Sequence, residues 1–253
     1  MSILNLLWII PLSVMVGIFI NHLSDTLPRL RKITFVPICI SCNQSMNFIN
    51  YVSLKNCPKC NARSQLRKPI LTTIFIITYV LLLYFPPEFA GLYLSFLIIP
   101  YLFLVFIIDL EHRLILHPVS IFGAILFGLL GLYLNGWKET ILGGGIGFIS
   151  MFTLYLLGLL FSKWVAKRRG EPLDEVALGY GDVNLTGVLG LLFGWPRIAV
   201  LLFFAIMLGG IFSGIYMLLL KIKNKYDVFT PIPYAPFLII SALILLYLST
   251  STA

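Results

Sequence analysis

The run VNLTGVLGLLFGWPRIAVLLFFAIMLGGIFSGIYMLLL, residues 183–220, is almost continuously apolar. A membrane-spanning helix needs about 20 such residues, so this run is too long for one span. Gly194-Trp195-Pro196 interrupts it, because proline cannot continue a helix and restricts the residue before it. The run therefore predicts a short membrane helix that ends before Gly194, followed by a longer one over residues 197–220.

The rest of the 253-residue chain has the same apolar character. It is 59% hydrophobic and only 11% charged, with a mean hydropathy of +0.99, which is more apolar surface than a soluble domain of this size can bury. The first apolar segment lacks a basic n-region and a cleavage site, so we interpret it as a retained span rather than a signal peptide. The sequence predicts an all-α polytopic membrane protein with about eight transmembrane helices; the other spans are 3–22, 69–85, 91–109, 115–134, 140–162 and 233–249.

The positive charge follows the predicted loops. With the N-terminus outside, 16 of the 18 lysines and arginines fall in cytoplasmic loops, and only Lys138 and Arg197 fall outside. This asymmetry is the positive-inside pattern of membrane proteins. The basic cytoplasmic loops therefore explain the net charge of +8, and no nucleic-acid partner is expected. Glycines four residues apart, Gly143 with Gly147 and Gly210 with Gly214, predict close helix packing in two of the spans.

All four cysteines lie in the predicted cytoplasmic loop 23–68. They form the pattern C-x2-C-x14-C-x2-C, whose spacing suits four thiolates around one tetrahedral zinc. The reducing cytoplasm disfavours disulfides. The loop is therefore predicted to be a small zinc-stapled module, and the alternative is a loop of reduced thiols without metal. The four ligands would be Cys39, Cys42, Cys57 and Cys60.

Two aspartates lie at the ends of apolar runs, both at the predicted cytoplasmic face. Asp109 ends one span in FIIDLEHR, and Asp182 begins the next short span in GYGDVNL. Carboxylates at a membrane edge are costly and usually functional. Two of them could share one proton, one acting as base on a water while the other polarises a carbonyl. Gly179 and Gly181 allow another chain to approach closely, whereas the alternative is that Asp182 is an ordinary N-terminal helix cap.

Together these features resemble the type IV prepilin peptidases, a family of membrane aspartyl proteases named for a GxGD motif. GIFINHLSDTLPR, residues 17–29, resembles the family's G-S-F-L-N…R-x-P stretch, and the paired CxxC loop follows it. FIIDLEHRLILHP resembles I-D-x-x-x-x-x-I-P-[DN], and GYGDVNL resembles GxGDxKL. PIPYAPFL, residues 231–238, resembles P-F-G-P-x-L.

The resemblance implies an eight-span endopeptidase in the bacterial inner membrane. It implies that Asp109 and Asp182 are catalytic and that the enzyme removes the basic leader of prepilins or pseudopilins at the cytoplasmic face. Glu175 is the acid that the family often carries before GxGD, and with Glu111 and Asp174 it would attract a basic leader; the alternative is that these three acids are solvated loop charges. The implied organisation is a first helix at 1–22, the cysteine loop at 23–68 and a seven-helix peptidase domain at 69–253.

The sequence departs from the family pattern at several positions. Asn184 stands where the family has lysine, and Leu116-His117 replaces Pro-Asp. After the last cysteine, QLRKPILT keeps Arg67 and Pro69 but lacks the family's acid. N-methylation of the new N-terminus, which would need S-adenosylmethionine, therefore stays open. Two alternatives also stay open: a proton-coupled transporter, and a related peptidase acting on preflagellin-like proteins.

Overall fold

The chain folds into helices joined by turns and loops. A computed structural model describes residues 3–31, 36–39, 42, 44–52, 56–61, 67–169, 179–222 and 233–248. Apart from one isolated antiparallel bridge between Ile38 and Ser45, all regular structure in these residues is helical, as predicted. The helices are α1 (Ile3–Leu30), α2 (Phe48–Val52), α3 (Arg67–Tyr84), α4 (Gly91–His112), α5 (His117–Asn135), α6 (Trp137–Arg169), α7 (Tyr180–Phe193), α8 (Arg197–Ile222) and α9 (Ala235–Tyr247).

Six of these helices are long and apolar enough to cross a membrane. They are α1, α3, α4, α5, α6 and α8, and they support a multi-pass membrane protein. The predicted break in the long apolar run is confirmed, since α7 ends at Phe193 and α8 begins at Arg197. With 14 and 13 residues, α7 and α9 are about 20 Å long, shorter than a hydrocarbon core of about 30 Å. The count of eight spans therefore stays a prediction.

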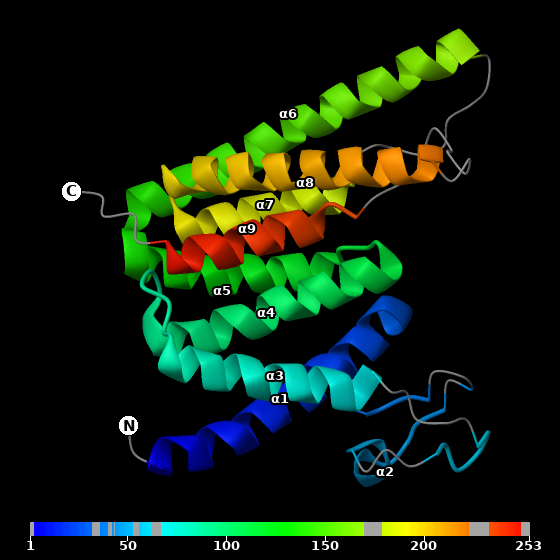
Figure 1. The fold of residues 1–253 in the computed structure, drawn as a ribbon, viewed down its shortest axis with the longest axis vertical. Helices are drawn as coiled ribbons and strands as arrows, with labels where there is room; N and C mark the ends of the chain where they lie inside the picture. Colours follow the sequence, from blue (N-terminus) through cyan, green and yellow to red (C-terminus); the bar gives the residue numbers. More distant parts are fainter. Residues whose placement is uncertain are drawn as a thin grey trace. The chain divides into compact units, whose positions relative to one another are not determined.

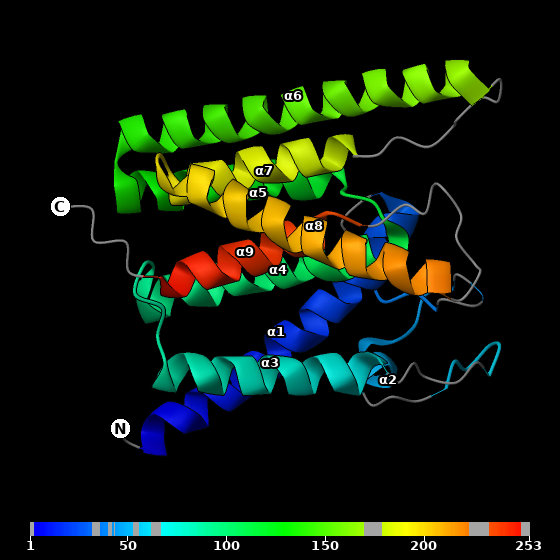
Figure 2. The same cartoon turned by 45° about the horizontal axis from the view of Figure 1, so that its top comes forward.

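The chain divides into two compact units, Met1–Ile108 and Asp109–Ala253. In the first unit α1 packs against α3. In the second unit α7 contacts α5, α6, α8 and α9, and it runs among these helices in Figures 1 and 2. The boundary falls inside α4, so both predicted catalytic aspartates belong to the second unit.

Helix α1 continues past the predicted end at residue 22 and reaches Leu30. Its last turns carry polar side chains that are nearly inaccessible to solvent, Asn21, His22, Ser24, Asp25 and Thr26. Buried polar groups need hydrogen-bond partners. Asn21, Ser24 and Asp25 find theirs in Tyr51 and Arg67, and the Thr26 hydroxyl donates to a carbonyl within α1. Packing rather than hydropathy therefore sets the length of this helix.

Glycines hold α7 in close contact with its neighbours. A Cβ atom at Gly190 of α7 would lie 2.2 Å from the carbonyl oxygen of Gly143 in α6, and a Cβ at Gly131 of α5 would lie 1.9 Å from that of Leu191. The prediction of close packing at Gly143 and Gly147 is confirmed, because a Cβ at Gly147 would lie 2.9 Å from the Thr186 carbonyl oxygen.

The same prediction is wrong for Gly210 and Gly214. A Cβ atom at either position would have no other atom within 4 Å in the described structure. Both glycines lie on the exposed side of α8, which suits contact with lipid. Equal sequence spacing therefore has different consequences on α6 and α8.

Replacing Gly190 with alanine should strongly destabilise the second unit. The added methyl group cannot avoid the α6 backbone, and overpacking of this kind costs about 1–3 kcal/mol. Thermal unfolding of the purified protein in detergent would measure the loss as a lower Tm. Gly145→Ala is the matched control, because a Cβ at Gly145 meets no atom within 4 Å. Equal Tm values for the two variants would contradict this description of the α6–α7 contact.

Candidate functional site

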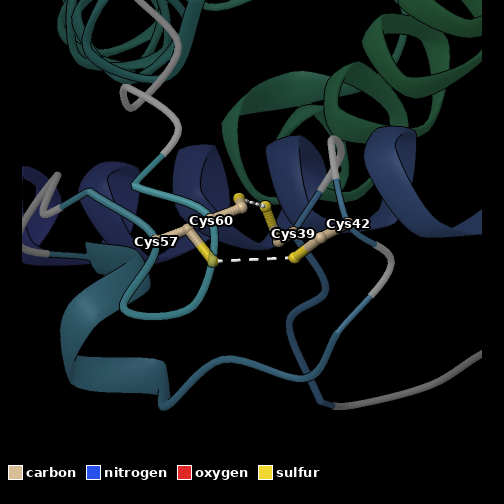
Figure 3. Close-up of side chains that lie close together, drawn as sticks. All are labelled: Cys39, Cys42, Cys57 and Cys60. Carbon is tan, nitrogen blue, oxygen red and sulfur yellow. Dashed lines mark hydrogen bonds between the residues drawn. The ribbon is translucent and has the colours of Figure 1, made fainter.

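The four predicted metal ligands come together in the first unit (Figure 3). Their sulfur atoms all lie within 4.8 Å of one another. The sulfurs of Cys39 and Cys60 are 3.6 Å apart, and those of Cys42 and Cys57 are 3.7 Å apart. Around a tetrahedral ion with metal–sulfur bonds of 2.3 Å, sulfur atoms would be separated by about 3.8 Å. The donor set and its spacing therefore fit a four-thiolate metal site.

Backbone hydrogen bonds shape both CxxC segments. The N–H of Cys39 donates to the carbonyl of Gln44 at 2.8 Å, next to the Ile38–Ser45 bridge. In the second segment, the backbone N–H groups of Cys60 and Lys59 lower the pKa of the Cys57 thiol to about 6. Since the thiolate is the form that binds metal, this turn prepares Cys57 to act as a ligand.

A buried polar network fastens this module to α1 and α3. The Tyr51 hydroxyl of α2 accepts a hydrogen bond from Asn21 Nδ2 at 2.6 Å and donates one to Asp25 Oδ2 at 2.9 Å. The guanidinium of Arg67, at the start of α3, forms an ion pair with Asp25 and donates from Nε to Asn21 Oδ1 at 3.1 Å. Burial and the Asp25 carboxylate raise the pKa of Tyr51 above its ordinary value, so its phenol stays a proton donor. The ammonium of Lys68 lies 3.5 Å from the centre of the Tyr51 ring.

The two predicted catalytic aspartates lie near each other in the second unit. Asp109 is in the last turn of α4 and Asp182 in the first turn of α7, and they are only 5% and 7% exposed. Their carboxyl groups are close enough to interact electrostatically. A separation of 73 positions in the sequence is therefore closed by the fold.

Each carboxyl group is held by a backbone donor. The N–H of Gly179 donates to Asp182 Oδ2 at 3.2 Å, and the N–H of Ala235, at the start of α9, donates to Asp109. The N-cap residue is Gly179, and Asp182 is the third helical residue, whose side chain accepts the N-cap N–H in a capping box. The alternative role of Asp182 in capping this helix is therefore supported, beside its place in the pair. Asp109 Oδ2 is buried and accepts no hydrogen bond from the described residues.

The two glycines near Asp182, Gly179 and Gly181, have different surroundings. A Cβ atom at Gly181 would lie 2.7 Å from the Cβ of Ile115, so the space beside Gly181 is filled by the chain's own α4–α5 loop. A Cβ atom at Gly179 would lie 3.3 Å from Asp182 Oδ2, so this glycine leaves room for the aspartate. The predicted site residue Glu175 lies outside the described residues.

A cleft of about 370 Å³ lies between α5, α6 and α7. It is lined by apolar and small residues together with the polar side chains of His117, Ser120 and Asn184. Asn184 follows Asp182 by two positions, which is about 200° around the helix, so the cleft opens on the other side of α7 from the carboxylates. His117 and Asn184, two departures from the family pattern, therefore share one site.

Sequence reasoning missed several of these contacts. Asp25 and Tyr51 fall within the predicted loop 23–68, and a lone acid just after an apolar run is the one sequence signal of their buried contact. Ile115 and Ala235 contribute through packing and a backbone N–H. Such contacts leave no signal in residue type, so only the fold reveals them.

The sequence profile of the Type IV leader peptidase family matches residues 96–214. The matched residues include both aspartates and the whole of α5, α6 and α7. This region is similar to the type IV leader peptidase family. The resemblance to type IV prepilin peptidases is thereby confirmed.

Curated relatives extend the similarity beyond the matched domain. A prepilin leader peptidase/N-methyltransferase of Legionella pneumophila is 28% identical over 229 residues, which cover 87% of this chain and 72% of the relative. Proteins of the same name from Stutzerimonas stutzeri and Pseudomonas aeruginosa are 26% and 27% identical. Those alignments cover 53% and 55% of this chain but only 42% and 44% of the relatives. No solved structure matches the chain.

Replacing Arg67 with glutamine should loosen the cysteine module of this leader peptidase relative. The substitution leaves the buried Asp25 carboxylate without its ion-pair partner, and breaking such a pair costs about 3 kcal/mol. We expect a clearly lower Tm in thermal unfolding followed by tryptophan fluorescence. Arg31→Gln, at an exposed position just after α1, is the control. If both variants unfold like the wild type, the network does not hold the module.

Proposed function

We propose that the chain is an aspartic endopeptidase that removes the basic leader peptide from type IV prepilins or pseudopilins. The observation that carries the proposal is the meeting of Asp109 and Asp182, two buried carboxyl groups on different helices, inside the region that matches the leader peptidase family. The names of the curated relatives support the substrate class. A proton-coupled transporter has no such support.

In the proposed reaction the aspartate pair activates a water molecule. One carboxylate removes a proton from the water while the other, protonated, donates a hydrogen bond to the carbonyl of the scissile peptide. The backbone donors at Gly179 and Ala235 each hold one carboxyl group in place. The buried Asp109 Oδ2 has no partner among the described residues, and a buried acceptor of this kind is suited to bind the water or the substrate.

The proposed reaction takes place at the cytoplasmic face of the bacterial inner membrane, with the N-terminus outside. The charge asymmetry of the loops supports this orientation. A prepilin keeps its apolar helix in the membrane and presents its basic leader in the cytoplasm, so its cleavage site lies at the membrane edge. Glu111, beside this edge at the end of α4 and 4.0 Å from the His112 ring nitrogen, adds a negative charge that would attract the leader.

The cysteine module is proposed to hold a structural zinc ion. Cys39, Cys42, Cys57 and Cys60 would bind it as thiolates, and four-cysteine zinc sites are usually closed and structural. When bound, zinc would stabilise the fold of the loop. The reducing conditions of the proposed cytoplasmic location favour thiolates over disulfides.

N-methylation of the new N-terminus is a second candidate function. The observation that favours it is the name of the relatives, which joins leader peptidase and N-methyltransferase. This activity would use S-adenosylmethionine as the methyl donor. Mass spectrometry of the processed pilin separates the two cases, because a methylated N-terminus adds 14 Da to the cleaved product.

Removing either carboxylate should abolish cleavage of a prepilin in membranes. Asp109→Asn and Asp182→Asn are nearly isosteric, and loss of an acid–base group costs about 10³-fold in rate. The measurement is the shift of prepilin to mature pilin on gels, with the amount of each variant checked by immunoblotting. Glu88→Gln is the control, because this exposed acid precedes the start of α4, at the other end of the helix that carries Asp109.

Three outcomes of this experiment would separate the candidates. Cleavage by wild type and by Glu88→Gln, with none by either aspartate variant, supports the paired-acid mechanism. Near-normal cleavage by either aspartate variant would refute that mechanism. If wild type cleaves a preflagellin but no prepilin, the substrate class is wrong while the peptidase assignment stands.

The purified protein should contain about one zinc ion per chain, as expected for a single four-thiolate site. Cys57→Ser removes one ligand, and we expect most of the zinc to be lost and the Tm to fall. Inductively coupled plasma mass spectrometry measures the metal content. Ser45→Ala, a substitution in the same module that removes no thiol, should keep the zinc. A wild type purified without metal chelators that holds no zinc would contradict the site.

A further inference from the structure

Tyr234 lies beside both aspartates, and the peptidase mechanism above does not use it. It directly precedes α9 as the helix N-cap, and its carbonyl accepts the Phe237 N–H at 3.0 Å. The next residue, Ala235, donates its backbone N–H to Asp109. On the other side, the Tyr234 hydroxyl is close enough to Asp182 to interact with its charge.

The ring of Tyr234 is fixed by its packing. It lies 6.1 Å from the Phe237 ring, measured between ring centres. It also rests on Gly209 of α8, where an added Cβ atom would lie 3.2 Å from Tyr234 Cε2. A larger residue at position 209 would displace the ring, so the absence of a side chain at Gly209 allows Tyr234 to pack against α8.

The hydroxyl of Tyr234 makes no hydrogen bond to any of the described residues, in contrast to the hydroxyls of Tyr51 and Tyr79. The side chain is half-buried. The hydroxyl oxygen is not one of the buried polar atoms that lack a partner, so it can be reached by a ligand. The hydroxyl interacts with Asp182 through charge but makes no hydrogen bond to it, so its donor and its acceptor are available to a ligand.

The sequence separates the roles of the ring and the hydroxyl. PIPYAPFL resembles the family pattern P-F-G-P-x-L, in which the position of Tyr234 is a phenylalanine. The ring is therefore common to the pattern, and the hydroxyl is an addition in this chain. A group that the pattern lacks is better suited to bind substrate than to carry out the shared chemistry.

We propose that the Tyr234 hydroxyl is a substrate-binding contact that hydrogen-bonds to the peptide backbone of the substrate next to the scissile bond. This inference rests on the proposed peptidase function. An extended peptide that leaves the bilayer and passes between the aspartates offers carbonyl and N–H groups along its length. The phenol can serve either, because it donates and accepts. The contact exists before and during the reaction, so it contributes to binding and not to the chemical step.

The test is the steady-state cleavage of a prepilin by wild type and Tyr234→Phe in detergent or nanodiscs. The variant keeps the ring and removes one hydrogen bond, worth about 0.5–1.5 kcal/mol, so KM should rise about 3- to 10-fold with kcat unchanged. Tyr133→Phe is the matched control, because this exposed tyrosine lies near the far end of α5. Its kinetics should equal those of wild type.

Direct binding gives a second measurement. With Asp109→Asn as an inactive background, adding Tyr234→Phe should weaken the binding of intact prepilin by the same 3- to 10-fold. Unchanged KM and unchanged binding would overturn the proposal, and so would a loss confined to kcat. A wild type that cleaves no prepilin would instead refute the proposed function, which distinguishes the two failures.

Discussion

The close contact between α7 and its neighbours is the constraint on which the second unit depends. Helix α7 carries Asp182 and has ten buried residues among its 14. A helix of this length is shorter than the hydrocarbon core, so it needs protein around it. Glycines on α5, α6 and α7 provide this environment by bringing backbones together. Close packing replaces the hydrophobic effect as the force between membrane helices, and here it positions the helix that bears the carboxylate.

Once α7 is in place, the remaining requirement is to bury two carboxyl groups without trapping them in one unreactive arrangement. Direct ion pairs would neutralise both groups. Among the residues that the structure describes, each carboxyl group instead has one backbone N–H donor, Gly179 for Asp182 and Ala235 for Asp109. These donors fix the direction of each carboxyl group and leave its second oxygen to water or substrate. The Asp25 carboxylate of the first unit is the contrast, because Tyr51 and Arg67 occupy both of its oxygens. The contacts of Asp25 thus stabilise the first unit, whereas those of Asp109 and Asp182 leave carboxyl oxygens accessible to water or substrate.

The sequence was sufficient for the architecture where the signal is carried by residue type. Apolar runs predicted the six long helices, the Gly194–Pro196 interruption predicted the end of α7, and CxxC spacing predicted the sulfur cluster. The sequence did not predict features that depend on contacts between residues distant in the chain. Helix α1 continues through Asn21 and Asp25 because Tyr51 and Arg67 satisfy them, and hydropathy alone reads such a stretch as a loop. Gly210 and Gly214 have the spacing of packing residues, but no described helix packs against them, since spacing does not reveal which face of a helix meets protein. Ala235 acts through its backbone, which every residue possesses.

The motifs that carry the family resemblance are separate in sequence but meet in pairs in the structure. Asn21 of the N-terminal motif bonds Arg67 after the last cysteine. Ile115 of the first aspartate motif packs against Gly181 of the second, and Ala235 of the last motif bonds Asp109. Two residues that depart from the family pattern are also brought together, since His117 and Asn184 line the same cleft. If motif residues specify contacts rather than isolated roles, a change at one member is tolerated best when its partner changes too. The family pattern would place a lysine and an aspartate or asparagine in this cleft, and the chain has an amide and an imidazole there. Asn184 therefore removes the ammonium group of the pattern, and His117 removes the carboxylate that the pattern allows beside it.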